Sequence, residues 1–322
     1  MTVAVVITCH NEEAYIEQAV RSVAAQTAFD RVVEIIVIDD GSTDGSPVLL
    51  ARLAQEIDCL RVLRTEGIGV AAARNTGIRG TTAPLIAFLD ADDYWVPDKL
   101  ERQLAAYATD DGRVGLVYSD FVDFTRPDAS DALLVTVRRF HADTPETLAG
   151  YFVHDAPIVP STTLMRRSVF EDVGLFDERI RLGEDTEMFL RVAERWNFQY
   201  VQGGLVYKRR HGQNLTRRLD ALIPISEEVT KTFVARNPSL GPVARQRLSR
   251  RYARAGHDCA LHGETRDALR YLGLACTNAP LFWRPYGYLA LMLVPRGLRD
   301  DVLRAGKRVY HGAMRQVPTA VR

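Results

Sequence analysis

One stretch of the chain, residues 85–93, limits the fold more than any other. It reads Leu-Ile-Ala-Phe-Leu-Asp-Ala-Asp-Asp, so five apolar residues run directly into three carboxylates. A short apolar run bounded by polar residues indicates a buried strand, and ligands bind at the carboxyl ends of strands in open α/β sheets. Carboxylates this close repel one another unless a positive charge lies between them. A hard divalent cation that also carries phosphate oxygens meets that need; the alternative is a solvated acidic turn.

Strands and helices alternate through the first part of the chain. The patterns predict strands at 3–8, 34–38, 60–63, 85–89, 114–118 and 161–165, and helices near 16–23, 46–54, 70–79 and 184–196. Residues 201–208 read as a pair of strands around Gly203 and Gly204, whereas the pattern within 121–160 assigns no element. This alternation predicts βαβ units and a parallel sheet.

The charge is divided unevenly along the 322 residues, although lysine plus arginine and aspartate plus glutamate each number 41. Residues 1–225 hold 24 basic and 34 acidic side chains, a net charge of −10, and residues 226–322 hold 17 and 7, a net charge of +10. An acidic front suits a metal site and a basic tail suits an anionic partner. We therefore expect a domain at 1–225 and a basic helical region at 226–322, in which residues 248–280 resemble a single tetratricopeptide-like hairpin.

The cysteine spacing and the N-terminus exclude several classes of protein. The four cysteines never occur in a CxxC pair, which argues against a zinc or redox motif. We expect a reduced, cytosolic protein. The first residues lack a basic region and enter a strand at once, so they do not resemble a signal peptide, and the chain contains no run of 18 apolar residues that would span a membrane.

Five motifs occur in a fixed order along residues 2–215. They are Thr8-Cys9-His10-Asn11-Glu12, Asp39-Asp40-Gly41-Ser42-Thr43-Asp44, Ala73-Arg74-Asn75-Thr76-Gly77, Asp90-Ala91-Asp92-Asp93 and Glu184-Asp185. In order and spacing they resemble family 2 glycosyltransferases of the GT-A fold. The resemblance implies an α/β protein with a mixed, mainly parallel sheet flanked by helices. It also implies inverting sugar transfer from a UDP-, GDP- or dTDP-linked donor to an acceptor hydroxyl, with Mn²⁺ or Mg²⁺ as cofactor.

The resemblance assigns the first four motifs to the nucleotide-sugar donor. It implies that Asp40 contacts the base and that Arg74 helps to hold the nucleotide. It further implies that Asp90 faces the ribose or the sugar. The segment with Thr8, Asn11 and Glu12 would lie along the nucleotide. The alternatives are a turn-capping role for Asp40 and an ordinary ion pair for Arg74.

The resemblance also implies the metal ligands and the catalytic base. Asp92 would bind the metal, with Asp93 able to share that role, and Asp185 would deprotonate the acceptor with support from Glu184. A last motif, Tyr-Lys-Arg-Arg-His at 207–211, is one residue longer than the Tyr-Arg-x-His common in the family. His211 is therefore a candidate third metal ligand or a phosphate-neutralising group, and the alternative is a solvated basic loop.

The C-terminal region contains an apolar, aromatic segment at 279–299 that is flanked by arginines. It is too short and too interrupted to span a bilayer. It suits peripheral contact with an anionic membrane on its cytoplasmic face, and the alternative is a helix pair packed on the enzyme. We expect a saccharide or glycolipid acceptor, in the assembly of a polysaccharide, lipopolysaccharide or glycolipid, and no nucleic-acid partner.

Two other classes of protein share this predicted scaffold. A nucleotide-sugar pyrophosphorylase-like enzyme requires a glycine-rich, basic phosphate loop after the first strand, and residues 8–13 provide neither feature. A non-catalytic sugar- or nucleotide-binding protein would be expected to have lost Asp92 or Asp185, and both are present. A polyprenyl-phosphate glycosyltransferase would carry a stronger membrane element than 279–299.

Overall fold

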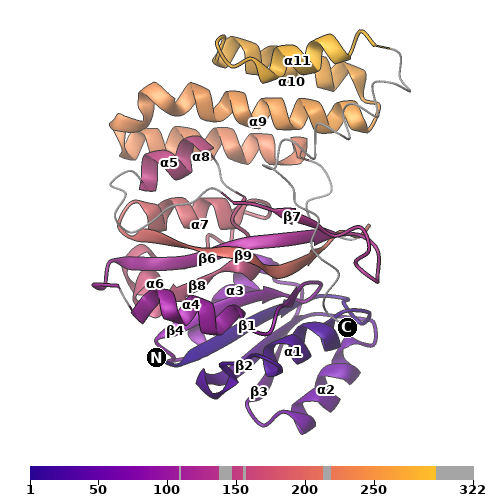
Figure 1. Cartoon of the computed structure of the whole chain (residues 1–322), viewed down its shortest axis with the longest axis vertical. Helices are drawn as coiled ribbons and strands as arrows, with labels where there is room; N and C mark the ends of the chain where they lie inside the picture. The colour runs from indigo at the N-terminus through magenta and orange to yellow at the C-terminus, as the bar shows by residue number, and fades with distance from the viewer. Residues whose placement is uncertain (109, 138–146, 155–156, 213–218, 295–322) are drawn as a thin grey trace. The chain divides into compact units, whose positions relative to one another are not determined.

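The computed structural model describes residues 1–108, 110–137, 147–154, 157–212 and 219–294. These residues form two compact units (Figure 1). The first unit contains the described residues of 1–147 and 157–210, and the second contains those of 148–154 and 211–294.

The first unit alternates strands and helices over its first hundred residues. Its elements are β1 (Val3–Cys9), α1 (Ile16–Ala24), β2 (Val32–Asp40), α2 (Ser46–Glu56), β3 (Leu60–Thr65), α3 (Val70–Arg79), β4 (Leu85–Asp90), β5 (Tyr94–Trp95), α4 (Lys99–Ala108), β6 (Val114–Phe124), β7 (Leu133–Val135), β8 (Leu164–Arg166), α6 (Arg167–Val173), α7 (Glu184–Ala193) and β9 (Asn197–Arg209). The predicted α/β class is therefore confirmed.

The nine strands found among the described residues belong to one sheet, ordered β3-β2-β1-β4-β8-β6-β9-β5, with β7 paired to β6. The pairs β1–β2, β1–β4, β2–β3 and β6–β9 are parallel, and β4–β8, β6–β8, β6–β7 and β5–β9 are antiparallel. The sheet is thus mixed, with the parallel βαβ units at its N-terminal side, as the resemblance implied.

Close packing of helix α3 on strand β1 brings the first motifs together. A Cβ atom at Gly77 would lie 2.3 Å from Cγ1 of Val6, so only glycine allows this approach. Val6 is 1% exposed and its neighbours Val5 and Ile7 are fully buried. Burial of such a side chain stabilises the fold by about 1.5–3 kcal/mol. The helix that carries Arg74 is therefore held directly against the strand that carries Thr8.

The structure corrects the sequence-based prediction at residues 201–208. These residues are part of one strand, β9, and not a pair of strands. Gly203 has a positive φ of 117°, and the register between β9 and β6 shifts near it. Beyond the shift, the pairing of the two strands continues as far as Phe124 and Arg209. The glycines therefore form an irregularity in a long strand, because a register shift absorbs the extra residues without reversing the chain.

The second unit is helical. It comprises α5 (Thr147–His154), α8 (Ile223–Arg236), α9 (Gly241–Leu261), α10 (Thr265–Asn278) and α11 (Arg284–Leu291). Helices α9 and α10 form the predicted hairpin, with Ala253, Ala255 and Ala275 in a shared apolar core. Helix α11 lies on the side of α9 away from α8 (Figure 1). Among the described helices, none has both the length and the apolar character needed to cross a membrane.

Candidate active site

The motif residues gather where the parallel strands end. Strand β1 lies between β2 and β4, so that Cys9 is opposite Asp39 and Thr8 is opposite Asp90. The Thr8 hydroxyl donates to Oδ1 of Asp90 over 3.5 Å, which is a weak bond. Three segments up to 82 positions apart in the sequence therefore share one edge of the sheet.

Arg74 connects two of the acidic motifs. Its guanidinium donates through Nη2 to Oδ1 of Asp90 over 2.8 Å and through Nη1 to Oε1 of Glu184 over 2.6 Å. The side chain is only 3% exposed, and its Nε finds no partner among the described residues. Burial tends to raise the pKa of Asp90, but the charges of Arg74 and Lys208 outweigh it and hold that pKa below its usual value. Asp90 is therefore an anion held in place by Arg74.

The two carboxylates at the start of α7 differ in environment. Gly183 precedes the helix in the left-handed conformation, with a φ of 81°. Glu184 is buried, and its burial, together with the neighbouring charge of Asp185, raises its pKa to about 6. Asp185 is half-buried, and its Oδ1 accepts the Thr186 N–H over 2.6 Å. A carboxylate at a helix N-terminus is stabilised as an anion, so Asp185 has the environment of an ionised base.

Oxygen atoms of Asp90, Asp92 and Asp93 lie within 4.8 Å of one another, a donor set that suits Mg²⁺ or Mn²⁺. The three residues are not equivalent. Asp93 is 1% exposed and accepts bonds from the Ser161 hydroxyl over 2.7 Å and from the Arg209 N–H over 3.1 Å. Burial and the charges of Asp92 and Asp90 raise the pKa of Asp93 to about 8. A metal-binding role for Asp93 stays a prediction, as it does for Asp92.

Lys208 brings a positive charge to this acidic cluster. Its Nζ lies 3.9 Å from Oδ2 of Asp93. Burial tends to lower the pKa of Lys208, but the charges of Asp93, Asp92 and Asp90 raise it above the ordinary value. The amine is thus charged at neutral pH and neutralises part of the repulsion among the carboxylates.

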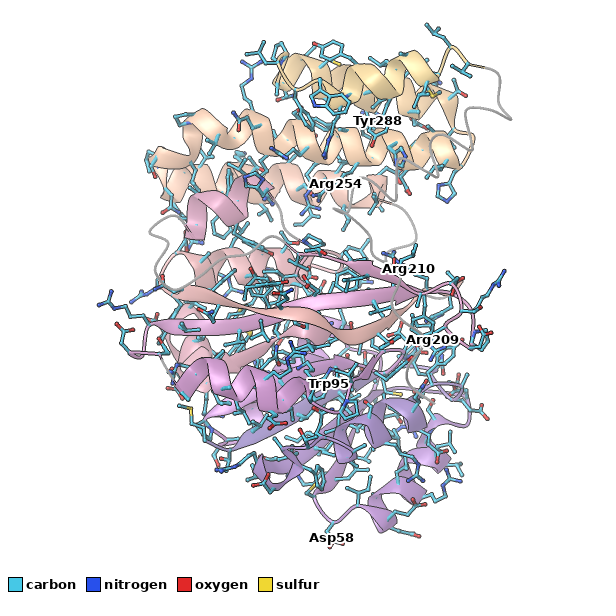
Figure 2. The ribbon with its side chains drawn as sticks, viewed as in Figure 1. Asp58, Trp95, Arg209, Arg210, Arg254 and Tyr288 are labelled. Atoms are coloured by element: carbon cyan, nitrogen blue, oxygen red, sulfur yellow. The ribbon has the colours of Figure 1, made fainter. Side chains whose placement is uncertain are left out.

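Arg209 fixes the position of the acidic turn from strand β9 (Figure 2). Its guanidinium carbon lies 4.4 Å from the ring centre of Tyr15 and 4.6 Å from that of Phe124. Its Nε donates to the main-chain carbonyl of Asp92 over 3.2 Å, and its Nη2 donates to Gln18 Oε1 over 2.7 Å. Since the main-chain N–H of Arg209 also donates to the Asp93 carboxylate, Arg209 holds Asp92 and Asp93 in place.

Asp40 accepts three hydrogen bonds from the segment that leads into α3. Oδ1 accepts from the Thr65 hydroxyl over 2.6 Å and the Ile68 N–H over 2.7 Å, and Oδ2 accepts from the Gly69 N–H over 2.8 Å. Burial opposes ionisation, but these bonds outweigh it and lower the pKa of Asp40. A carboxylate has about four acceptor positions, so its two oxygens retain about one for a ligand.

Asn11 and Glu12 meet the loop that follows β2. The Asn11 N–H donates to Ser42 Oγ, and its Oδ1 accepts the Thr43 N–H over 2.8 Å. Asn11 takes a positive φ of 57°, which asparagine tolerates better than most residues. The side chain of Asn11 therefore ties two loops together, and its predicted contact with the nucleotide stays a prediction.

Glu12 contributes an unpartnered polar atom to the same region. Its N–H donates to Ser46 Oγ over 3.0 Å, but its Oε2 is buried and has no hydrogen-bond partner among the described residues. Burial, followed by the charge of Asp92, raises the pKa of Glu12 to about 8. A ligand hydroxyl, a water or a metal ion beside Asp92 would satisfy this buried acceptor.

His211 opens the second unit. Its predicted role beside the metal or the diphosphate stays a prediction.

The sequence comparisons identify the family of the chain. The family model described as "Glycosyl transferase family 2" matches residues 4–174. An uncharacterized glycosyltransferase of Nostoc sp. (strain PCC 7120) is 30% identical over 238 residues, which are 72% of this chain and 71% of that protein. The chain belongs to glycosyl transferase family 2. The succinoglycan biosynthesis protein ExoU of Rhizobium meliloti is 34% identical over 59% of this chain, and the match spans only 56% of ExoU.

Solved structures of glycosyltransferases share the fold. S. aureus TarS 1–349 in complex with UDP-GlcNAc has a TM-score of 0.63 at 16% identity, over 96% of this chain and 91% of that one. Mannosyltransferase PcManGT from Pyrobaculum calidifontis, in complex with GDP-Man and Mn²⁺, has a TM-score of 0.58 at 17% identity, over 96% and 87%. The GT-A architecture predicted for this glycosyltransferase is thereby confirmed.

Sequence reasoning missed three residues that shape the site of this glycosyltransferase, namely Ser161, Lys208 and Arg209. Ser161 donates to Asp93 and also accepts the Asp90 N–H over 3.1 Å. Lys208 and Arg209 were recognised only as part of a basic run. The antiparallel pairing of β9 with β5, in which Tyr207 lies opposite Tyr94, places both residues next to the acidic turn, and the sequence pattern did not predict this pairing.

Proposed function

We propose that this glycosyltransferase transfers a sugar, with inversion, from a nucleotide diphosphate sugar to an acceptor hydroxyl. The observation that carries the proposal is the Arg74 bridge, which joins the predicted donor residue Asp90 to the predicted catalytic pair through Glu184. An inverting transfer requires the donor and the base to lie on opposite sides of one anomeric carbon. Because a single side chain, Arg74, bonds to both motifs, they lie close enough to act on the same carbon.

In this proposal Asp185 takes the proton from the acceptor hydroxyl. The helix N-terminus favours the ionised carboxylate. Asp185 is half-buried, whereas Glu184 is buried and bonded to Arg74, so Asp185 is the more accessible of the two. Glu184 then acts as a positioning residue for Arg74 and Asp90. Loss of a general base costs roughly 10²–10⁴ in rate.

The donor side of the proposal uses the acidic turn. Asp92 would hold Mn²⁺ or Mg²⁺, with Asp90 nearby, and the oxygen donors of this cluster fit either ion. When bound, the metal supplies Lewis-acid stabilisation to the leaving diphosphate. Lys208 adds a fixed positive charge, and Arg209 keeps the turn in place. The complexes of TarS with UDP-GlcNAc and of PcManGT with GDP-Man and Mn²⁺ support a nucleotide-sugar donor.

We also propose a role in the assembly of a polysaccharide, a lipopolysaccharide or a glycolipid. The support is the similarity to ExoU, a succinoglycan biosynthesis protein. The acceptor would be a saccharide or a glycolipid.

The test is a calorimetric titration of UDP, GDP and dTDP into the protein, with and without Mn²⁺, repeated on Asp92→Ala and on Asp185→Asn. We expect one nucleotide to bind in a metal-dependent manner. Asp92→Ala should abolish that dependence, and Asp185→Asn should bind the nucleotide normally. A protein that binds no nucleotide under any condition would refute the proposal.

A transfer assay then separates an enzyme from a binding protein. With a nucleotide sugar that binds, Asp185→Asn should lower kcat by about 10²–10⁴-fold with little change in donor KM. Equal rates for Asp185→Asn and the wild type would remove Asp185 from the mechanism.

A further inference from the structure

The end of the helical unit exposes a concentrated set of large apolar side chains. Leu281 is 99% exposed, Trp283 is 71%, Tyr286 is 46% and Leu293 is 89%. They are four of the nine large hydrophobic side chains exposed by the described part of the chain, and they fall within 13 residues. Single exposed hydrophobic residues are normal, but a cluster of them marks an interaction surface.

These residues form a stripe along α11 and its flanks. Tyr286 and Ala290 lie on one side of α11, and Trp283 and Leu293 continue the same three- and four-residue spacing at its two ends. The opposite side, with Tyr288, Leu291 and Met292, packs on an apolar core that contains Cys259, Ala260 and Ala268. The helix is therefore apolar on both sides, a pattern typical of a helix that is covered on both sides. We call the exposed stripe, together with Leu281, the α11 face.

The charge around the α11 face is positive. Residues 279–299 contain three arginines and no carboxylate, and residues 226–322 have a net charge of +10. Arg266 and Arg270 are exposed on the adjacent helix α10. A second copy packed through the same face would bring the same positive charge against this surface, which disfavours a symmetric dimer there. Anionic lipid headgroups, by contrast, attract basic residues.

We infer that the α11 face docks on an anionic lipid bilayer. Tryptophan and tyrosine prefer the boundary between headgroups and acyl chains, and an amphipathic surface with flanking arginines binds in that plane without spanning the membrane. Leu281, Trp283 and Leu293 enter the boundary, and the exposed Arg266 and Arg270 of α10 contact the headgroups. The inference does not depend on the chemistry of the active site.

The experiment is flotation of the full-length protein with vesicles of phosphatidylglycerol and phosphatidylcholine, compared with pure phosphatidylcholine vesicles. We expect binding only to the anionic vesicles, weakened by salt. The double variant Leu281→Ser/Trp283→Ser should lose about tenfold or more in vesicle affinity, because both side chains leave the bilayer. The matched control Val48→Ser/Ile68→Ser, which alters exposed apolar residues of the first unit (74% and 46% exposed), should bind like the wild type.

A second measurement tests the same inference independently if the double variant folds poorly. Brominated phosphatidylglycerol should quench part of the tryptophan fluorescence of the wild type, and Trp283→Phe should remove that part while keeping vesicle binding. The inference is overturned by no binding to anionic vesicles or by equal binding to neutral ones. It is equally overturned by an unaffected double variant, or by a wild-type dimer that the double variant dissociates, because a second copy is then the occupant.

Discussion

Arg74 is the residue on which the acidic side chains of the site depend most directly. A buried arginine between two carboxylates is costly to remove, since each partner is then left as an uncompensated charge. We expect Arg74→Gln to lower the free energy of unfolding by about 3–5 kcal/mol. Urea denaturation measures this, and Arg52→Gln, which removes an exposed partner of Glu17, serves as the control with a loss of about 1 kcal/mol or less. Similar losses in both variants would contradict this account.

Lys208 is expected to control the affinity of the acidic turn for divalent cations. Its amine competes electrostatically with a metal ion, because it is 3.9 Å from Asp93 and close to the other two carboxylates. Lys208→Met should therefore tighten Mn²⁺ binding by roughly three- to thirtyfold. Calorimetric titration of Mn²⁺ measures the change, and the exposed Lys231→Met is the matched control. Weaker Mn²⁺ binding in Lys208→Met would show that the lysine supports the metal site.

At the scale of elements, the contact between α3 and β1 decides whether the motifs meet. Gly77→Ala would place a Cβ 2.3 Å from Val6, so the helix must move away from the strand. We expect a loss of about 1–3 kcal/mol in stability. Thermal unfolding of Gly77→Ala, Val6→Ala and the double variant forms a complete cycle. The double variant should be more stable than the sum of the single effects predicts, and simple additivity would place the strain elsewhere.

At the scale of the whole molecule, acidic groups in the first unit make stability depend on pH. The folded state raises the pKa of Glu12 from 4.5 to about 8. The contribution of this group to stability is complete below pH 4.5 and is lost as the pH rises through 8. Without metal, the wild type should therefore lose stability from pH 5 to 9.

The variant Glu12→Gln isolates this effect. The stability of this variant should depend less on pH than that of the wild type. Its unfolding midpoint should lie above that of the wild type at pH 9, and the two midpoints should become equal near pH 4.5. Unfolding curves at matched ionic strength check this. Parallel profiles for the two proteins would mean that Glu12 keeps its ordinary pKa.

The sequence by itself determined the strands that carry the motifs, because short apolar runs bounded by polar residues, such as 85–89, favour a buried strand. It also determined the family, because five motifs occur in order and the family model covers residues 4–174. Only the tertiary structure decided which residues of the different motifs contact one another. The bonds from Arg74 to Asp90 and Glu184 join residues up to 110 positions apart, and the position of Lys208 beside the acidic turn follows from the register of β9 against β5. Local patterns report which side of an element is buried, whereas contacts between distant residues depend on how whole elements pack.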